Sequence, residues 1–166
     1  MKIILISDTH MPRMAKRIPP RLAEELETSD FILHAGDWQT LDLADELSRY
    51  APVDGVAGNT DPPEIEKQFG RKKLLTLDGL RIGIVHGDGT GGTTPGRALD
   101  AFKDERPDLI LFGHSHIPFM EERDGILLFN PGSPTDKRRQ PQFSFGVLET
   151  GDGDPRPRHV FYDSKR

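Results

Sequence analysis

Two short stretches of the sequence carry pairs of side chains that could bind metal ions. Asp8 and His10 are separated by one residue, and so are His114 and His116. In an extended segment, residues i and i+2 point to the same side, so each pair could bind one ion. Paired imidazoles at this spacing recur in metal sites, whereas an Asp-x-His alone is more often a surface turn.

Three further residues of ligand type stand elsewhere in the chain, namely Asp37, Asn59 and His86. With the two pairs they make a set of oxygen and nitrogen ligands that suits two divalent ions about 3.5–4 Å apart, with one carboxylate shared between the ions. Two such ions keep a net positive charge after Asp8, Asp37 and one hydroxide are counted. The remaining charge would draw a phosphate anion into the site.

Each ligand follows a short apolar run that has the character of a buried strand. The runs are residues 2–7, 31–34, 53–57, 81–85 and 109–112. Each run ends at a glycine or a polar residue, as buried strands do. Because sites in open α/β sheets form beyond the carboxyl ends of the strands, we expect five loops to converge there.

The segments between and after these runs indicate a mixed α/β fold. Residues 19–27 and 41–48 place leucines four apart, as amphipathic helices do, so strand and helix alternate and predict right-handed βαβ units. The Asp-Gly pairs at 78–79 and 124–125 separate apolar runs and predict hairpins with two-residue turns of positive φ. We expect one domain that spans residues 1–166, with a partly antiparallel second sheet.

Composition excludes several classes of protein. The chain has 166 residues, no cysteine and a net charge of −5, so disulfides, thiolate metal sites and a broad nucleic-acid surface are not expected. It contains no apolar stretch long enough to span a bilayer and no signal peptide at its start. We expect a cytoplasmic protein that acts on a small phosphorylated substrate, without membrane contact; a homodimer stays open.

The order of the motifs resembles the calcineurin-like metallophosphoesterases, and the short chain resembles their small bacterial and archaeal phosphodiesterase branch. The likeness covers about residues 1–148 and rests on Asp8-x-His10, Gly36-Asp37, Gly58-Asn59, His86-Gly87 and Gly113-His114-x-His116. The resemblance implies two mixed β-sheets packed as a sandwich and flanked by helices in four layers, with the metals at one edge.

The resemblance also implies how the ligands divide between two metal ions. One ion would be bound by Asp8, His10, Asp37 and His116, and the other by Asp37, Asn59, His86 and His114. Asp37 would bridge the ions, and Asp37, Asn59 and His86 would be the catalytic residues. We expect manganese, with iron, zinc, nickel or cobalt as alternatives, and an affinity that falls as protons compete near pH 6.5.

The implied activity is hydrolysis of a small organic phosphodiester or phosphomonoester by a metal-bridging hydroxide, with the diester favoured. Many larger members carry a histidine where this sequence has Thr60, and that histidine is thought to protonate the leaving group or to bind phosphate. Without it, catalysis should rest on the metals and good leaving groups should react faster. The alternative function is a protein-interaction scaffold, like a retromer subunit of this fold, that keeps the metal site.

Three residues near the motifs have supporting interpretations. Asp61 precedes two prolines, so it could cap a helix that begins at Glu64; we favour this cap together with some orienting role at the site. His34 is expected to be a hydrogen-bonded histidine that supports the ligands rather than a ligand. His159 is expected at the surface of a last strand.

Three segments keep two interpretations each. Residues 130–133, Asn-Pro-Gly-Ser, form either a loop beside the site or a plain turn. The glycine-rich residues 87–96 form either a mobile rim or a disordered surface loop. The cations at 137–139 either steer anions towards the site or belong to a solvated turn.

Overall fold

The computed structural model of the protein describes residues 1–151 and 153–166. Its strands in this part of the chain are β1 (Lys2–Ile6), β2 (Phe31–His34), β3 (Val53–Gly55), β4 (Lys72–Leu77), β5 (Leu80–Val85), β6 (Leu109–Leu111), β7 (Phe119–Arg123), β8 (Ile126–Asn130), β9 (Phe143–Glu149) and β10 (Arg158–Tyr162). The helices are α1 (Pro20–Leu26), α2 (Leu41–Ser48), α3 (Pro63–Phe69) and α4 (Thr94–Ala101). None of these helices is long and apolar enough to cross a membrane.

The strands form two five-stranded sheets. The first sheet has the order β10-β9-β1-β2-β3, and the second has the order β4-β5-β6-β8-β7. Parallel pairing joins β1, β2 and β3 in the first sheet and β5, β6 and β8 in the second. The remaining pairs are antiparallel, including both predicted hairpins. Each sheet is therefore mixed, as expected.

Side-chain alternation along β1 shows how the layers are built. Ile3 and Leu5 belong to the core between the two sheets, which also contains Ile82 and Leu109 of the second sheet. Ile4 belongs to a second core on the other face of the first sheet. Because successive side chains of a strand point to opposite faces, a buried strand of this kind needs a layer on each side.

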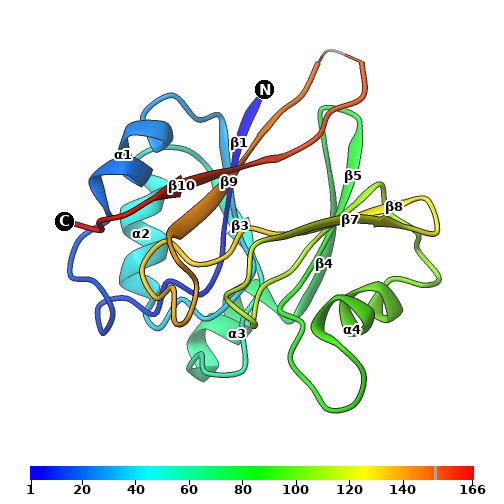
Figure 1. Ribbon diagram of the computed structural model, residues 1–166, viewed down its shortest axis with the longest axis horizontal. Helices are drawn as coiled ribbons and strands as arrows, with labels where there is room; N and C mark the ends of the chain where they lie inside the picture. The colour runs from blue at the N-terminus through cyan, green and yellow to red at the C-terminus, as the bar shows by residue number, and fades with distance from the viewer. Residues whose placement is uncertain (152) are drawn as a thin grey trace.

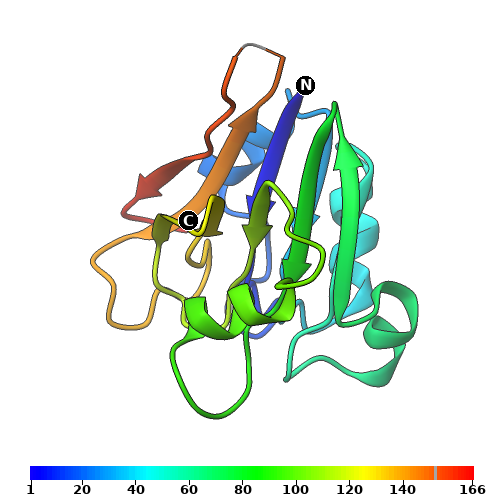
Figure 2. The ribbon, with the colours of Figure 1, turned by 90° about the vertical axis from the view of Figure 1, so that its right-hand side faces the viewer.

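The helices supply the two outer layers. The core on the outer face of the first sheet contains residues of α1, α2 and α3, and the core on the outer face of the second sheet contains Ala98 of α4 and Phe102 after it. In Figure 1, α1 and α2 lie on one side of the molecule and α4 lies on the opposite side. Figure 2, seen from the side of α4, shows that helix in front of the second sheet. The four-layer fold is confirmed.

The glycine-rich segment differs from its expected form. Residues 94–96 are not a loop, because they begin α4. Thr93 caps this helix by accepting a hydrogen bond from Gly96 N at 3.1 Å. The guanidinium of Arg97 then donates to Gly87 O at 3.0 Å and to Gly91 O at 2.9 Å. These bonds tie the remaining loop to the helix, which a disordered surface loop would not show.

Candidate metal centre

The loops that follow strands of both sheets meet at one end of the sandwich. They carry Asp8 and His10 after β1, Asp37 after β2, Asn59 after β3, His86 after β5, and His114 and His116 after β6. Two hydrogen bonds join the sheets here: His86 Nδ1 donates to Ala35 O at 2.8 Å, and His114 N donates to Asp8 Oδ2 at 2.9 Å. The loops therefore converge as expected.

Two groups of donor atoms are each compact enough to surround one ion. The groups are Asp8, His10 and His116, and Asp8, Asp37 and His86, with the donor atoms of each group within 4.8 Å of one another. Asp37 Oδ2 lies 3.1 Å from His86 Nε2 and 3.6 Å from His10 Nε2, so it stands between the groups. Asp8 Oδ1 lies 3.5 Å from His116 Nε2 and 3.7 Å from His86 Nε2. Both carboxylates are thus central.

Five buried atoms of the ligand residues have no hydrogen-bond partner within the described part of the chain. They are Asp8 Oδ1, His10 Nε2, His86 Nε2, His114 Nδ1 and His116 Nε2. Leaving a buried polar atom unpaired costs about 1–3 kcal/mol, so five such atoms in one place indicate a bound group that satisfies them. Imidazole and carboxylate donors suit divalent transition metals. The residues therefore fit divalent metal ions.

The second ring nitrogen of two histidines is fixed by backbone carbonyls. His86 Nδ1 donates to Ala35 O, and His116 Nδ1 donates to Asp136 O at 2.6 Å. Each bond selects the tautomer whose Nε2 keeps its lone pair, which is the usual arrangement of a metal-binding histidine. Sequence reasoning missed Asp136 and Ala35 because both contribute a carbonyl, which any residue type provides.

Each central carboxylate has one oxygen held by the protein and one left free. Asp8 Oδ2 accepts hydrogen bonds from Ser7 Oγ and His114 N, both at 2.9 Å. Asp37 Oδ1 accepts from Thr60 N at 3.0 Å. These bonds fix both carboxylate planes, so that Asp8 Oδ1 and Asp37 Oδ2 are oriented towards the histidine nitrogens before any ion binds.

Five of the seven expected ligands have a left-handed backbone. The φ angles are 57° at Asp8, 44° at His10, 60° at Asp37, 70° at His114 and 62° at His116. This conformation costs a residue other than glycine roughly 1–2 kcal/mol. Backbone strain of this kind persists where the surroundings fix it, and it is concentrated at functional sites. The backbone of the loops, as well as the choice of side chains, therefore shapes the centre.

Asp61 holds the loop that carries Asp37. Its Oδ2 accepts from the backbone N–H of Asp37 and of Gly58, both at 2.8 Å, and its Oδ1 accepts from Gln39 N at 2.9 Å. The expected helix-cap role is wrong, because α3 begins at Pro63 and Pro62 is its N-cap. Both carboxylate oxygens are used by the ligand loops instead. Asp61 therefore positions Asp37.

His34 lies under the ligand loops and is fully buried. Its Nδ1 accepts a hydrogen bond from Gly36 N at 3.0 Å, its Nε2 lies 2.9 Å from Thr9 Oγ1, and its ring stacks on Trp38 at a centroid distance of 4.0 Å. Burial holds the pKa of His34 well below its usual range, so the ring is neutral. His34 supports the loops of Asp8 and Asp37 from below.

The segment at 130–133 lies against the ligand loops rather than apart from them. Ser133 Oγ donates to Asp8 O at 2.8 Å, and Asn130 Nδ2 donates to Gly113 O at 3.0 Å. Thr135, just beyond the segment, donates through Oγ1 to Thr9 O at 2.5 Å. Of its two interpretations, the loop beside the site is the one that the hydrogen bonds support.

Two of the seven expected ligands are less buried than the others. His114 is half-buried, and its ring meets the His86 ring edge-on at a centroid distance of 5.2 Å. Asn59 follows β3 at the same end of the sandwich, and its side chain is exposed. The two compact donor groups therefore lie inside, with Asn59 and His114 at the rim.

The two remaining interpretations concern the C-terminal third of the chain. His159 lies on β10 but is half-buried rather than at the surface, because its Nε2 lies 2.7 Å from Asn130 O and its ring stacks on Phe129. In the basic segment, Arg138 is exposed. Burial is the main cause of the lowered pKa of His116, and the positive charge of Arg138 adds to it. The charge of Arg138 is therefore felt at His116, which is compatible with the anion-steering interpretation of this segment.

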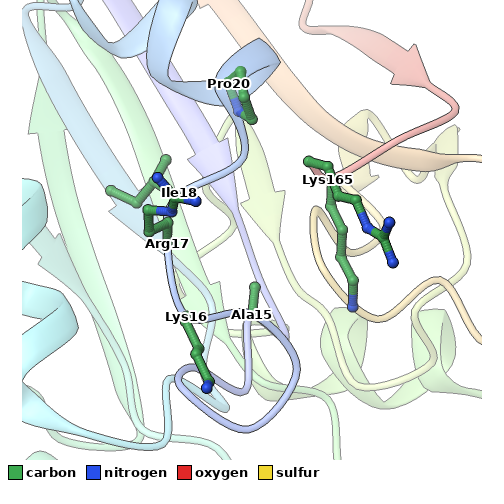
Figure 3. Close-up of a pocket in the computed structure, with 7 residues that line it drawn as sticks. Ala15, Lys16, Arg17, Ile18, Pro20 and Lys165 are labelled. Atoms are coloured by element: carbon green, nitrogen blue, oxygen red, sulfur yellow. The ribbon is translucent and has the colours of Figure 1, made fainter.

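The cavity in Figure 3 lies away from the ligand residues. It has a volume of about 640 Å³ and is lined by residues of the loop after His10 and of the C-terminal segment, including Lys16 and Lys165. None of the seven expected ligands lines it. Lys165 Nζ donates to Thr135 O at 2.8 Å and also bonds to Met14 O, so it joins two loops that border the centre. Cavity volume alone does not locate the metal chemistry.

The pKa values of the central groups move apart in the protein without bound ions. Burial raises the pKa of Asp8 to about 7. Burial opposes the charged form of His86, but the Asp37 carboxylate 3.1 Å from its Nε2 and the charge of Asp8 outweigh this and raise the pKa to about 9. Burial lowers the pKa of His116 to about 4. The four imidazoles therefore do not titrate together near pH 6.5.

We expect the apparent affinity for Mn²⁺ to rise with pH up to about 9, where His86 loses its proton. Below pH about 7 an ion in the compact group of Asp8, Asp37 and His86 must displace protons from both Asp8 and His86, so affinity at this group should rise about 100-fold per pH unit. Between about 7 and about 9 only the proton on His86 competes, and the rise should be about tenfold per unit. Mn²⁺ titrations across this range measure the slopes; a constant affinity above pH 7 would contradict the raised pKa of His86.

Comparison with known proteins identifies relatives of the whole chain. A family model described as the calcineurin-like phosphoesterase superfamily domain matches residues 1–153. A probable metallophosphoesterase of Methanothermobacter thermautotrophicus is 37% identical over 144 residues, which cover 83% of this chain and 80% of that protein. A phosphodiesterase of Methanocaldococcus jannaschii is 29% identical over 147 residues, which cover 80% of this chain and 83% of that protein.

A solved structure of the same architecture comes from a eukaryote. Vps29 of Entamoeba histolytica, in a crystal structure with Zn²⁺, has a TM-score of 0.76 and 23% sequence identity, and the match covers 97% of this chain and 99% of that chain. At this identity the likeness shows the shared fold and leaves the choice between enzyme and scaffold to the residues of the site.

Proposed function

The chain belongs to the calcineurin-like phosphoesterase superfamily, and from that premise we propose that it is a dinuclear-metal-dependent enzyme that hydrolyses a small organic phosphodiester. Family membership and the cluster of candidate ligands together support a metal-dependent phosphoesterase. The finer proposal concerns the number of ions, the ester class and the roles of individual residues.

One observation carries the proposal. The two donor groups share Asp8, and Asp37 Oδ2 reaches a histidine of each group, so that neither group is complete without a carboxylate placed between them. A single ion would leave histidine nitrogens of the other group buried and unpaired. Two ions held by shared carboxylates would satisfy all of these atoms at once.

The proposed ligand sets follow the family pattern, in which Asp37 is shared between the two ions and Asn59 and His114 complete the second set. One ion would be held by Asp8, His10, Asp37 and His116, and the other by Asp37, Asn59, His86 and His114. When bound, two divalent ions supply Lewis-acid polarisation of the phosphoryl group and a water of lowered pKa. Manganese is our first choice, with iron, zinc, nickel and cobalt as alternatives, since all of them accept mixed imidazole and carboxylate ligands.

The chain's own residues orient this chemistry. Asp61 fixes the backbone of Asp37, and the carbonyl of Ala35 fixes the ring of His86. Thr60 contributes its backbone N–H to Asp37, while its side chain is an exposed hydroxyl that does not titrate as a general acid near neutral pH. Proton donation to the leaving group is therefore not supplied from this position.

Several observations support a small diester as the substrate. A relative of the chain is named a phosphodiesterase. The net charge of −5 disfavours the extended backbone of a nucleic acid. The positive charge that two bound ions would bring to the centre, with the charge of Arg138 also acting on His116, favours a compact phosphate group.

The experiment compares p-nitrophenyl diesters with alkyl diesters of rising leaving-group pKa. Metal-stripped protein should be inactive, and added Mn²⁺ should restore cleavage of the nitrophenyl compounds. A general acid would raise the rate by roughly 10²–10⁴-fold, and this contribution is absent here, so log kcat/KM should fall steeply as the leaving-group pKa rises. Thr60→His, with its metal content checked, should help poor leaving groups selectively.

Two outcomes would contradict this account. Full activity after removal of metal would exclude a metal-dependent enzyme. A shallow slope in the wild type would mean that another group already supplies the proton. A protein that binds two ions but cleaves none of the diesters or monoesters would instead favour the scaffold alternative, although the complete set of ligand side chains favours the enzyme.

A further inference from the structure

A second concave surface includes Pro118, which lies two residues after the ligand His116. It is a groove of about 360 Å³ lined by Pro118, Gln140, Pro141, Gln142 and Phe161, which we call the Phe161 groove. Its volume falls within the range of small-molecule sites, about 300–1,000 Å³. Its lining combines apolar rings with two amides, which is the composition of a site for a flat organic group.

Pro118 and residues 140–142, which line two parts of the groove, are both connected to the ligand His116. Pro118 is two residues after His116, so their Cα atoms lie within about 7 Å of each other. The opposite wall, residues 140–142, ends a segment that begins at Asp136, whose carbonyl accepts the hydrogen bond from His116 Nδ1. Two parts of the groove wall are therefore linked to His116, one through the chain and one through this hydrogen bond.

Phe161 is a firmly held aromatic ring at this surface. Its ring stacks on His159 at a centroid distance of 5.6 Å, and His159 stacks in turn on the buried Phe129 at 4.4 Å. His159 is fixed by its contact with Asn130 O. Phe161 nevertheless remains 49% exposed, which is unusual for a ring with such support. An aromatic ring held in this way can bind another ring at little cost in side-chain entropy.

The polar groups around the groove complement a phosphate ester. Gln140 provides both donors and an acceptor, whereas the amide of Gln142 is already bonded to Asp163 at 3.1 Å. Arg138 and Arg139 lie on the same segment, between Asp136 and Gln140, and both are exposed. Positive charge on this segment suits the phosphate of a ligand whose organic part occupies the groove.

On the premise of the proposed function, we propose that the Phe161 groove binds an aromatic or nucleobase group of the phosphodiester substrate, stacked on Phe161 beside the metal centre. Base–aromatic stacking is worth about 1–3 kcal/mol by alanine substitution, which corresponds to about 5- to 150-fold in affinity. The groove would thus select substrates that carry a ring over substrates that carry a small alkyl group.

The test measures the binding of phenylphosphonate and methylphosphonate to the Mn²⁺-loaded protein by calorimetry. The wild type should bind phenylphosphonate about 5- to 150-fold more tightly. Phe161→Ala should remove this preference and leave the affinity for methylphosphonate unchanged, whereas Phe161→Tyr should keep the preference. Leu74→Ala is the matched control, because Leu74 is 42% exposed on β4 in the other sheet.

Three results would overturn the proposal. They are equal binding of the two phosphonates, binding of neither, and a preference that Phe161→Ala does not change. Light scattering tests whether a second copy of the chain occupies the groove instead. If Phe161→Ala dissociates a dimer, the groove is an interface between two copies. The test needs no turnover, so a ring preference without hydrolysis would refute the proposed function alone, and hydrolysis without a ring preference would refute the groove alone.

Discussion

Asp37→Asn should lower metal occupancy at both sites and reduce kcat/KM for a nitrophenyl diester by about 10³-fold or more. Asp37 Oδ2 lies within 3.6 Å of a histidine nitrogen from each donor group, so the loss of its charge weakens both ions. A loss of several kcal/mol of transition-state stabilisation corresponds to that factor. Asparagine tolerates the left-handed backbone at this position, so the fold should survive. Metal analysis and steady-state kinetics measure the two effects.

Three further variants make the result specific. His10→Ala should leave about one ion bound, because His10 belongs to a single donor group. Asp8→Asn tests whether the other central carboxylate is shared as well, as its place in both groups indicates. Asp42→Asn, on the exposed face of α2, should change nothing. Wild-type metal stoichiometry in Asp37→Asn would refute the bridging role.

Gly58→Ala should damage both folding and metal binding, although Gly58 is not itself a proposed ligand. A Cβ at Gly58 would overlap Asp37 Oδ1 and would lie 2.5 Å from Asp37 N and 2.8 Å from Asp37 Cγ. The loop of Asp37 would have to move, which should lower the free energy of unfolding by about 1–3 kcal/mol. Displacing a supported ligand should also weaken metal binding about 10- to 100-fold. Thermal unfolding and Mn²⁺ titration measure the two losses.

Gly91→Ala separates the steric clash from a general cost of replacing glycine. An added Cβ there meets nothing within 4 Å, but the backbone has φ of 79°. This variant should therefore lose roughly 1–2 kcal/mol of stability and keep its metal affinity. Equal metal affinities for Gly58→Ala and the wild type would show that Asp37 has room to move after all.

Most of the fold could be predicted because buried strands and their turns produce short-range patterns in the sequence. The run at residues 2–7 corresponds to β1, and the Asp-Gly pair at 78–79 forms the expected turn, with φ of 51° at Asp78 and 81° at Gly79. By contrast, α4 was hidden because its start, Thr94-Pro95-Gly96, consists of residues that usually break helices. Strand β9 was not predicted, although Phe143, Phe145 and Val147 alternate with small residues along it.

The ligand residues could be predicted for a different reason: they are chemically rare types placed after strands. Their supporting contacts could not, because these depend on long-range approach. Ser133 reaches the carbonyl of Asp8 from 125 residues away. Local grounds predict that Asp61 caps a helix and has some orienting role at the site, whereas its partners are Asp37, Gln39 and Gly58. A local pattern cannot distinguish these alternatives, since both use the same carboxylate.

The left-handed backbone at five ligand positions also bears on how this fold could evolve. Each of these residues lowers the stability of the folded chain for the sake of the metal centre, and replacement by glycine would relieve the conformational cost. Mutations that remove the metal centre in this way therefore cost no folding stability, and several of them together would raise the free energy of unfolding. Related proteins that keep the sandwich but lose hydrolysis can therefore arise readily. Regaining the metal centre would require the left-handed backbone at each of these positions again, and each position would again lower the stability of the fold.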